Sequence, residues 1–401
     1  MKELDSEPLW TRSFVSTLVS MILLATPSAM IASVFSIYMM EELRQPSVVA
    51  GLVGAVYAVA CIFSRMFVPK LEQKIGLGRT IKVAFPLFLG LFLPYIVTTD
   101  IRLIFLLRFV SGICYAISHT SLMSIGIQCL SPSRKNEGIA YLSAVGMTSL
   151  AIGPYIGINV LQLWGYHGLF LFSCLAFVPG VVLLYLIRLP KMEHLHPAEQ
   201  PEAKTSFISK YLAVEILPLC FAALILAGCF STVTSFIAAY ALSMNLFSVS
   251  AYYFLFLAGS AILTRLASGK ISRLLGEMRL VYLCYLGSAL GYVVLSLARG
   301  TVLMMASAVL IGASAGFITP TLQIIAVRNK PQNRVSLIAA TYMTFMDLGS
   351  GLGTYMIGAL IPLLGYARFY GSVSPVVWIL PWIFLWIYSR KSNRPVLRAV
   401  D

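Results

Sequence analysis

RMFVPKLEQKIG, residues 65–76, returns two hundred residues later as RLASGKISRLLG, residues 265–276. Both stretches begin with arginine, end with glycine and carry further basic residues between these ends. At the same offset, Gly153 corresponds to Gly353. An offset that recurs at separate places indicates an internal duplication. We therefore expect the chain to consist of two similar halves.

The composition of the chain is that of a membrane protein. Of its 401 residues, 59% are hydrophobic and 11% are charged, and the mean hydropathy is +0.87, whereas a soluble protein carries about 25% charged residues. Continuously apolar runs of about 20 residues, long enough to cross a bilayer as helices, recur along the chain. We therefore predict an all-α integral membrane protein with twelve transmembrane helices. The predicted spans are residues 13–40, 47–68, 80–98, 103–129, 136–163, 169–188, 211–242, 248–268, 280–297, 301–327, 335–364 and 369–389.

Positive charge is distributed unevenly along this pattern. Of the 29 Lys and Arg residues, 24 lie near the two chain ends or in the connections that follow even-numbered spans. Basic residues collect on the cytoplasmic side of membrane proteins, so both termini are predicted to be cytoplasmic. The net charge of +14 therefore reflects membrane topology, and no nucleic-acid partner is expected.

One polar segment, residues 189–210, interrupts the apolar pattern and contains three prolines. It is predicted to be a cytoplasmic linker between an N-terminal six-helix bundle, residues 1–188, and a C-terminal bundle, residues 211–401. No P-loop appears, so ion gradients or facilitated diffusion are expected to drive the protein rather than ATP. The seven cysteines form no metal-ligand pattern, and no hydrolase motif lies in a span. We therefore expect no metal, no cofactor and no enzymatic activity.

The basic stretch after the second span resembles the loop signature of the major facilitator superfamily. Arg65, Gly76 and Arg79 match that signature, whereas Pro69 stands at a usual glycine and Gln73 at the usual aspartate. The resemblance implies two six-helix bundles around a central cavity, with basic loops that contact membrane lipids. A merely basic cytoplasmic loop is the alternative interpretation. The matching residues of the second copy are Arg265, Gly269 and Gly276.

The fourth span resembles the Arg-x-x-x-Gly motif of the same family. Arg108, Gly112, Tyr115 and His119 are separated by 4, 3 and 4 residues, so they share one helix face over roughly 16 Å. The resemblance implies that Arg108 assists proton transfer or pairs with substrate charge. The alternatives are a structural ion at Arg108 and a hydrogen-bonded core histidine at His119.

The fifth span carries Gly153, Pro154 and Gly157, which resemble the Gly-Pro motif of antiporters in this superfamily. Small residues allow helices to approach closely, and proline bends a helix. The usual terminal glycine of this motif is Ile158 here. The resemblance favours export over uptake.

Asp347, in the eleventh span, is the only acidic residue deep within any predicted span. A carboxyl group in such a position is costly to bury in its ionised form, so Asp347 could carry protons. A carboxyl group that forms hydrogen bonds between the two halves is the alternative. If protons drive this protein, the predicted carrier is Asp347, His119 or both.

The predicted central cavity is lined by hydroxyl, amide and aromatic groups rather than by charges. Such a lining suits an amphiphilic molecule that has few fixed charges. The candidate cavity residues are Thr26, Tyr115, Phe230, Thr234, Thr319 and Gln323.

The motifs together predict proton-coupled export of a small amphiphilic compound, such as a drug, a secondary metabolite or a metal chelator. We expect a monomer in the inner membrane of a bacterium that alternates between inward-open and outward-open states. Proton-coupled or facilitated uptake of a small metabolite is the main alternative. A receptor without transport activity is a further one.

Overall fold

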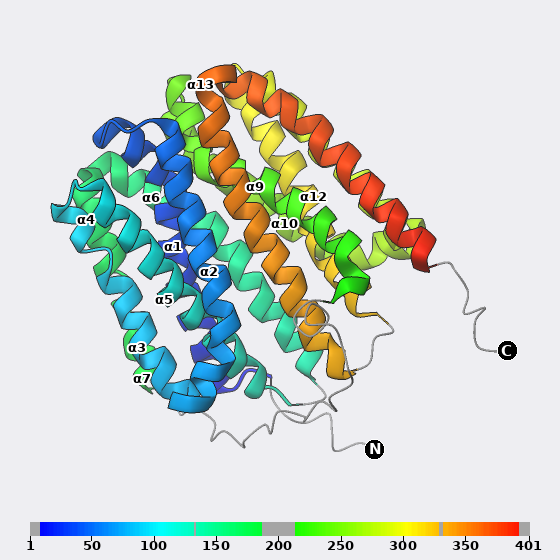
Figure 1. The fold of residues 1–401 in the computed structure, drawn as a ribbon, viewed down its shortest axis with the longest axis horizontal. Helices are drawn as coiled ribbons and strands as arrows, with labels where there is room; N and C mark the ends of the chain where they lie inside the picture. Colours follow the sequence, from blue (N-terminus) through cyan, green and yellow to red (C-terminus); the bar gives the residue numbers. More distant parts are fainter. Residues whose placement is uncertain (1–8, 132–133, 187–212, 329–331, 393–401) are drawn as a thin grey trace. The chain divides into compact units, whose positions relative to one another are not determined.

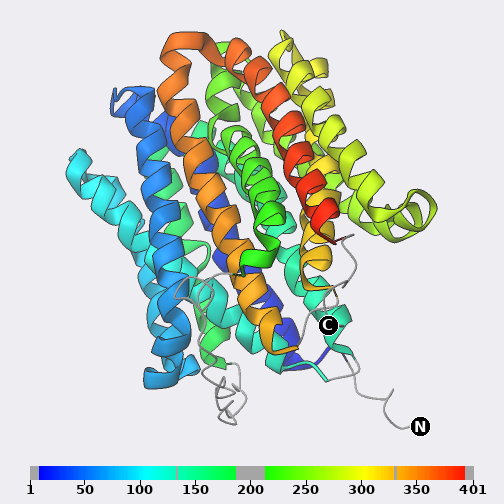
Figure 2. The same cartoon turned by 45° about the vertical axis from the view of Figure 1, so that its right-hand side comes forward.

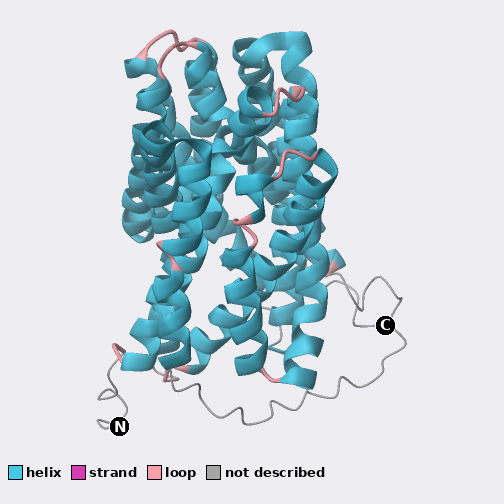
Figure 3. Cartoon of the chain, turned by 90° about the vertical axis from the view of Figure 1, so that its left-hand side faces the viewer, coloured by secondary structure: helices cyan, strands magenta, loops and turns pink. Residues whose placement is uncertain are grey.

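The computed structural model describes residues 9–131, 134–186, 213–328 and 332–392. Helices and short loops make up this part of the chain, and it contains no strand (Figure 3). The first series of helices is α1 (Arg12–Ile37), the π-helical turn η1 (Tyr38–Glu42), α2 (Ser47–Ile75), α3 (Leu77–Gly90), α4 (Pro94–Val97), α5 (Ile101–Gln128), α6 (Lys135–Leu175) and α7 (Val178–Leu186). The second series is the 3₁₀ turn η3 (Val214–Ile216), α9 (Leu217–Ser243), α10 (Phe247–Leu275), α11 (Glu277–Ser296), α12 (Thr301–Val327) and α13 (Gln332–Ser392).

Ten helical stretches of the described chain are long and apolar enough to cross a membrane. Two of them, Ala144–Tyr185 with 42 residues and Leu337–Arg390 with 54, exceed the roughly 20 residues that one crossing needs. Each contains one glycine with non-helical backbone angles, Gly165 or Gly365. Figure 1 shows α13 (orange to red) folding back on itself. These two stretches are therefore long enough for two crossings each, and the count of twelve stays a prediction.

The duplication is visible in the backbone. Helices α2 and α10 each contain 29 residues and begin 200 residues apart, at Ser47 and Phe247. The turns that follow them are at Gly76, with φ of 94°, and Gly276, with φ of 79°. The kinks inside α6 and α13 show the same offset, because Gly165 has φ of 65° and Gly365 has φ of 73°. Positive φ angles are costly for residues with a Cβ atom, so glycine is required at equivalent places in both halves.

The described chain forms two compact units. Unit 1 contains the described parts of residues 1–194 and also 234–258, and unit 2 contains those of 195–233 and 259–401. In unit 1, α1 packs on α6 and α5, and α2 packs on α5. In unit 2, α11 packs on α12 and α13 (Figure 2). The predicted linker, residues 189–210, and both predicted bundle boundaries lie outside the described residues.

Glycines set the closest helix contacts in unit 1. A Cβ atom at Gly112 would lie 2.6 Å from the Tyr57 carbonyl oxygen, so α5 and α2 touch here through their backbones. A Cβ atom at Gly153 would lie 2.7 Å from Ala29 Cβ and 2.8 Å from the Thr26 carbonyl oxygen. Because side chains are missing at these places, α6 can lie directly on α1.

Unit 2 repeats these contacts with a small shift. A Cβ atom at Gly353, the counterpart of Gly153, would collide with the Gly228 carbonyl oxygen and lie 2.5 Å from Ser231 Oγ on α9. The contact that corresponds to Gly112 is made by Gly316, where a Cβ atom would collide with the Ala261 carbonyl oxygen. Gly316 lies about one helical turn beyond Gly312, the counterpart expected from the sequence. The repeated halves thus use glycine for the same two helix pairs.

Candidate substrate and proton site

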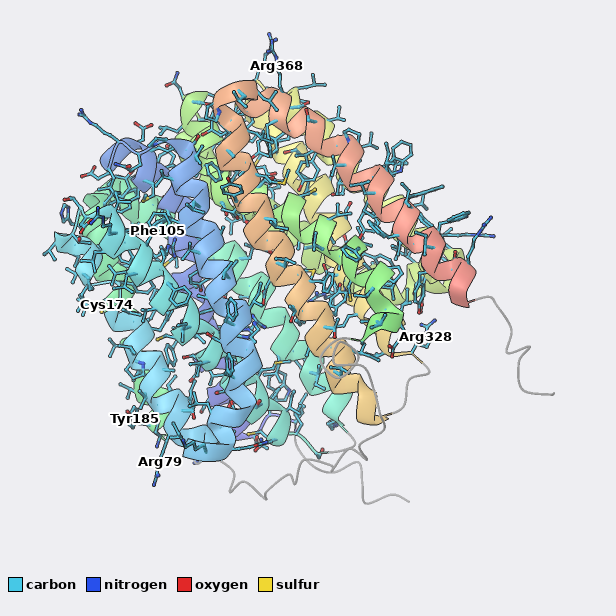
Figure 4. All side chains as sticks on the ribbon, viewed as in Figure 1. Arg79, Phe105, Cys174, Tyr185, Arg328 and Arg368 are labelled. Atoms are coloured by element: carbon cyan, nitrogen blue, oxygen red, sulfur yellow. The ribbon has the colours of Figure 1, made fainter. Side chains whose placement is uncertain are left out.

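Helix α5 carries the first group of candidate residues. It begins after Asp100, whose Oδ1 accepts a hydrogen bond of 2.9 Å from the Arg102 backbone N–H. Figure 4 places Phe105, near the start of α5, and Arg79, near the start of α3, toward opposite ends of unit 1. Arg108 therefore lies about two turns inside α5 from the end that is remote from Arg79.

Arg108 is buried among aromatic rings, with 7% of its surface exposed. Its Cζ lies 3.7 Å from the centroid of the Phe35 ring and 5.5 Å from that of Tyr57. Its Nε is fully buried and has no hydrogen-bond partner in the described chain. The titratable groups within its electrostatic reach are those of Tyr57, Tyr95 and Cys61, and none is a carboxylate. The charge is therefore stabilised by ring faces alone in the described chain.

Tyr95 on α4 is the second polar group in this place. It is 3% exposed, and its hydroxyl has no hydrogen-bond partner in the described chain. Its ring stacks on Phe170 at 5.1 Å between centroids and meets Phe35 edge to face at 5.8 Å. We name Phe35, Tyr57, Tyr95 and Arg108 the arginine box. Two buried polar groups in one box without partners indicate a site for a further polar group.

A line of polar aromatic side chains leads from this box along α5. The Tyr57 hydroxyl lies 3.0 Å from Ser28 Oγ, and the Tyr57 and Tyr115 ring centroids are 6.1 Å apart. Tyr115 in turn lies 5.7 Å from the His119 ring, and His119 is within electrostatic reach of Arg65. The structure thus places Arg108, Tyr115 and His119 along one line. Nearby on α1, Thr26 donates a hydrogen bond of 3.4 Å to Ser149.

The duplication shows which of these residues the fold does not require. Positions that shape the backbone keep glycine in both halves, as at Gly76 and Gly276. The polar residues of the box change at the same 200-residue offset to apolar ones. The residues at this offset from Tyr57, Tyr95 and Arg108 are Leu257, Leu295 and Ala308. With the one-turn shift of the α12–α10 contact, Ala261 and Gly312 take the places of Tyr57 and Arg108 and are likewise not polar. A helical bundle of this fold therefore forms without these three side chains, and a specific role explains them better than packing does.

The basic turn between α2 and α3 is built on Gly76, whose N–H donates to the Glu72 carbonyl oxygen at 2.9 Å. Glu72 lies beyond the membrane-spanning part of α2, and its carboxylate accepts a hydrogen bond of 2.5 Å from Ser121 on α5. Burial raises the pKa of the Glu72 carboxyl group, and this hydrogen bond opposes the rise. Arg65 is half-buried, whereas Arg79 points away from unit 1 (Figure 4).

Unit 2 holds the intramembrane carboxyl group. Asp347 is half-buried on the first leg of α13, two residues before Gly349. A Cβ atom at Gly349 would collide with the Leu224 carbonyl oxygen, so Asp347 stands beside a close backbone contact of α13 with α9. Figure 4 places Arg328 and Arg368 at opposite ends of unit 2, and Asp347 lies between them in the chain.

The remaining predicted residues are dispersed. Thr319, whose carbonyl oxygen accepts a hydrogen bond of 3.0 Å from Tyr342, is half-buried in unit 2, as are Phe230 and Gln323. Thr234 groups with unit 1. Arg265 lies within α10, about three turns before its end, and Gly276 follows its last residue. The surroundings of Gly269 lie outside the described residues. Whether these side chains line one cavity stays a prediction.

An apolar pocket of about 240 Å³ lies between α9 and the two legs of α13. Gly228, Gly349 and Gly353 contribute to its wall, together with Leu352, Met356 and other apolar side chains. It contains none of the predicted cavity or proton-coupling residues. In the described chain no group of three His, Cys, Asp or Glu residues could hold a metal ion.

Two repeated series of long apolar helices, one of them with a buried polar line, are the architecture of a multi-pass membrane protein. The sequence model of the Major Facilitator Superfamily matches residues 17–354, and the chain belongs to this family. The Staphylopine export protein of Staphylococcus aureus is 20% identical over 360 residues, which cover 86% of this chain and 89% of that protein. The expectation of a major facilitator transporter with a small-molecule substrate is thereby confirmed.

Solved structures show the same fold. The nucleoside transporter NupG superposes with a TM-score of 0.70 at 14% identity, covering 96% of this chain and 100% of that one. A POT family transporter in complex with a thioalcohol-conjugated peptide gives a TM-score of 0.77 at 14% identity, covering 96% and 97%. At these identities the similarity concerns the fold alone.

Proposed function

We propose that this transporter exports a small amphiphilic molecule in exchange for protons. The observation that carries the proposal is the direct contact of α6 with α1 at Gly153 and Gly157, on either side of the buried Pro154. This is the motif that, by resemblance, favours antiport. The similarity to an export protein along most of the chain supports the same direction.

Protons are carried, in this proposal, by Asp347. Ionised side chains are costly within the membrane, so protonation of Asp347 would make it easier for α13 to move past apolar neighbours. His119 lies on the polar line in unit 1 and is the second candidate carrier. Arg108 at the far end of that line would link substrate binding to the proton step.

The protein would alternate between inward-open and outward-open states, and the glycine contacts within each unit would let helix pairs adjust without interlocking side chains. Both termini would face the cytoplasm of a bacterium, as the basic loops indicate. The basic residues there would contact anionic lipid headgroups, and the protein would act as a monomer.

The test is uphill accumulation of a fluorescent amphiphile in inverted membrane vesicles. With an acidic lumen, dansylglycine, dansylglycinamide and ethidium are offered separately from outside. We expect accumulation of at least one probe, which collapses on addition of a protonophore and is absent in Asp347→Asn. Glu215→Gln, a change at the start of the η3–α9 segment, is the matched control, and this variant should accumulate the probe normally. Protonophore-insensitive transport would contradict proton coupling.

A further inference from the structure

We propose that the arginine box binds a carboxylate group, so that the substrate class is an amphiphilic molecule with one carboxylate on an apolar body. The proposal deepens the export function proposed above and relies on it for its biological role. All four residues of the arginine box lie in unit 1, so carboxylate binding is argued from unit 1 alone.

The first argument is the charge of Arg108. A guanidinium remains protonated in proteins, and burying it without an anion is costly. The Phe35 ring, at 3.7 Å from Cζ, stabilises the cation through one face of the guanidinium plane. The buried Nε–H at the edge of that plane has no acceptor in the described chain. An external anion would supply both the missing charge and the missing acceptor.

The second argument is the Tyr95 hydroxyl, which lies within electrostatic reach of Arg108 and has no hydrogen-bond partner in the described chain. A carboxylate has two oxygen atoms in one plane. One can accept from the guanidinium edge of Arg108, and the other from the Tyr95 hydroxyl. A single cation with one neutral donor suits one negative charge better than the two charges of a phosphate monoester.

The third argument concerns the walls of the box. Phe35 and Tyr57 lie beside the guanidinium, and Phe170 stacks on Tyr95. These rings offer apolar contact to the part of the ligand next to its carboxylate. An amphiphile with an aryl or alkyl body therefore suits the box better than a small hydrophilic acid does.

The repeat supplies an internal comparison. Unit 2 has Ala308 at the position of Arg108 and Leu295 at that of Tyr95. The equivalent helix α12 begins 200 residues after the first residue of α5, and it contains 27 residues where α5 contains 28. The box is therefore a specialised feature of one half, as a binding site for an asymmetric ligand would be.

The test compares acid and amide forms of the same probes on the purified full-length protein. Binding is measured as thermal stabilisation at increasing ligand concentration. The pairs are dansylglycine with dansylglycinamide, indole-3-acetate with indole-3-acetamide, and decanoate with decanamide. We expect at least one acid to bind about tenfold or more tightly than its amide, the range for a charge-assisted hydrogen bond.

Variants then assign the preference to the box. Arg108→Gln should remove the preference for the acid, Arg108→Lys should retain part of it, and Tyr95→Phe should reduce it about tenfold. Tyr285→Phe is the matched control, because the Tyr285 hydroxyl donates to the Ala222 carbonyl oxygen in unit 2 and is equally buried. It should lower stability without changing the preference. Melting of each variant without ligand establishes that it is folded.

Equal affinity for acid and amide in every pair, or absence of binding by every acid, would overturn the proposal. A preference that survives in folded Arg108→Gln would overturn it as well. An Arg108-dependent preference without proton-driven accumulation would support the box while contradicting the export function. Proton-driven accumulation of acid and amide to the same extent would support the export function while contradicting carboxylate binding by the arginine box.

Discussion

Replacing Gly353 by alanine tests the packing of α13 on α9. The new methyl group would collide with the Gly228 carbonyl oxygen and lie 2.5 Å from Ser231 Oγ. The backbone atom cannot rotate away, so the two helices must separate. Overpacking costs about 1–3 kcal/mol, and a collision with a backbone atom places this change in the upper part of the range, at about 2–3 kcal/mol; about 1 kcal/mol of improved helix propensity is then subtracted. We expect a net loss of about 1–2 kcal/mol in the free energy of unfolding.

The assay is thermal unfolding of the purified protein in one detergent, and the expected decrease is roughly 2–8 °C. Gly259→Ala on α10 is the matched control. No atom of a neighbouring element lies within 4 Å of a Cβ atom at Gly259, so this change should leave the melting temperature equal or higher. Equal melting of Gly353→Ala and the native protein would refute the inference that α13 and α9 touch through their backbones.

The glycine kinks, one hydrogen bond in unit 1 and the half-buried carboxyl group of Glu72 give three further tests. Alanine at Gly165 or Gly365 should each cost about 1–2 kcal/mol of stability, because φ is positive at both; native-like melting of both variants would contradict this. Gln162 donates a 2.8 Å hydrogen bond to Ser248, so cysteines at these two positions, in a cysteine-free protein, should be joined efficiently by a short thiol cross-linker; absence of the cross-linked product would contradict this contact. Burial raises the pKa of Glu72, so the native protein loses stability as pH rises above the ordinary carboxyl range. The melting temperature of the Glu72→Gln variant should therefore exceed that of the native protein at neutral pH, and the two values should converge in acid. A difference in melting temperature that does not change with pH would contradict this.

The sequence predicted most of the fold because membrane spans are long and continuously apolar. The predicted span 301–327 coincides with α12 (Thr301–Val327), and the span 47–68 begins with α2 at Ser47. The helix ends were harder to predict, because α2 continues to Ile75 through the basic stretch. Hydropathy predicts where a helix crosses the membrane, but it does not predict how far the helix continues outside the membrane.

The site was predicted less completely. Arg108, Tyr115 and His119 share one line, as the 4-3-4 spacing indicated. The aromatic partners of Arg108 were not predicted, because Phe35 and Tyr95 come from other helices and a single aromatic residue in a span usually indicates only packing. The duplication contained a usable signal, since Tyr95 corresponds to a leucine in the second half. No sequence signal indicated that Gly316, and not Gly312, makes the close contact with α10. Two packed helices can be displaced along each other by one turn, and a fixed sequence offset does not reveal this displacement.

The coupling of substrate transport to proton transport is tested most directly by letting a substrate gradient drive proton movement. Inverted vesicles are loaded with the best accumulated probe, diluted into probe-free buffer at equal pH on both sides, and followed with a luminal pH dye. Because exchange is reciprocal, probe that leaves the lumen should draw protons inward and acidify it. We predict this acidification in the native protein and its absence in Asp347→Asn. Downhill probe efflux at a constant luminal pH in the native protein would contradict proton-coupled export.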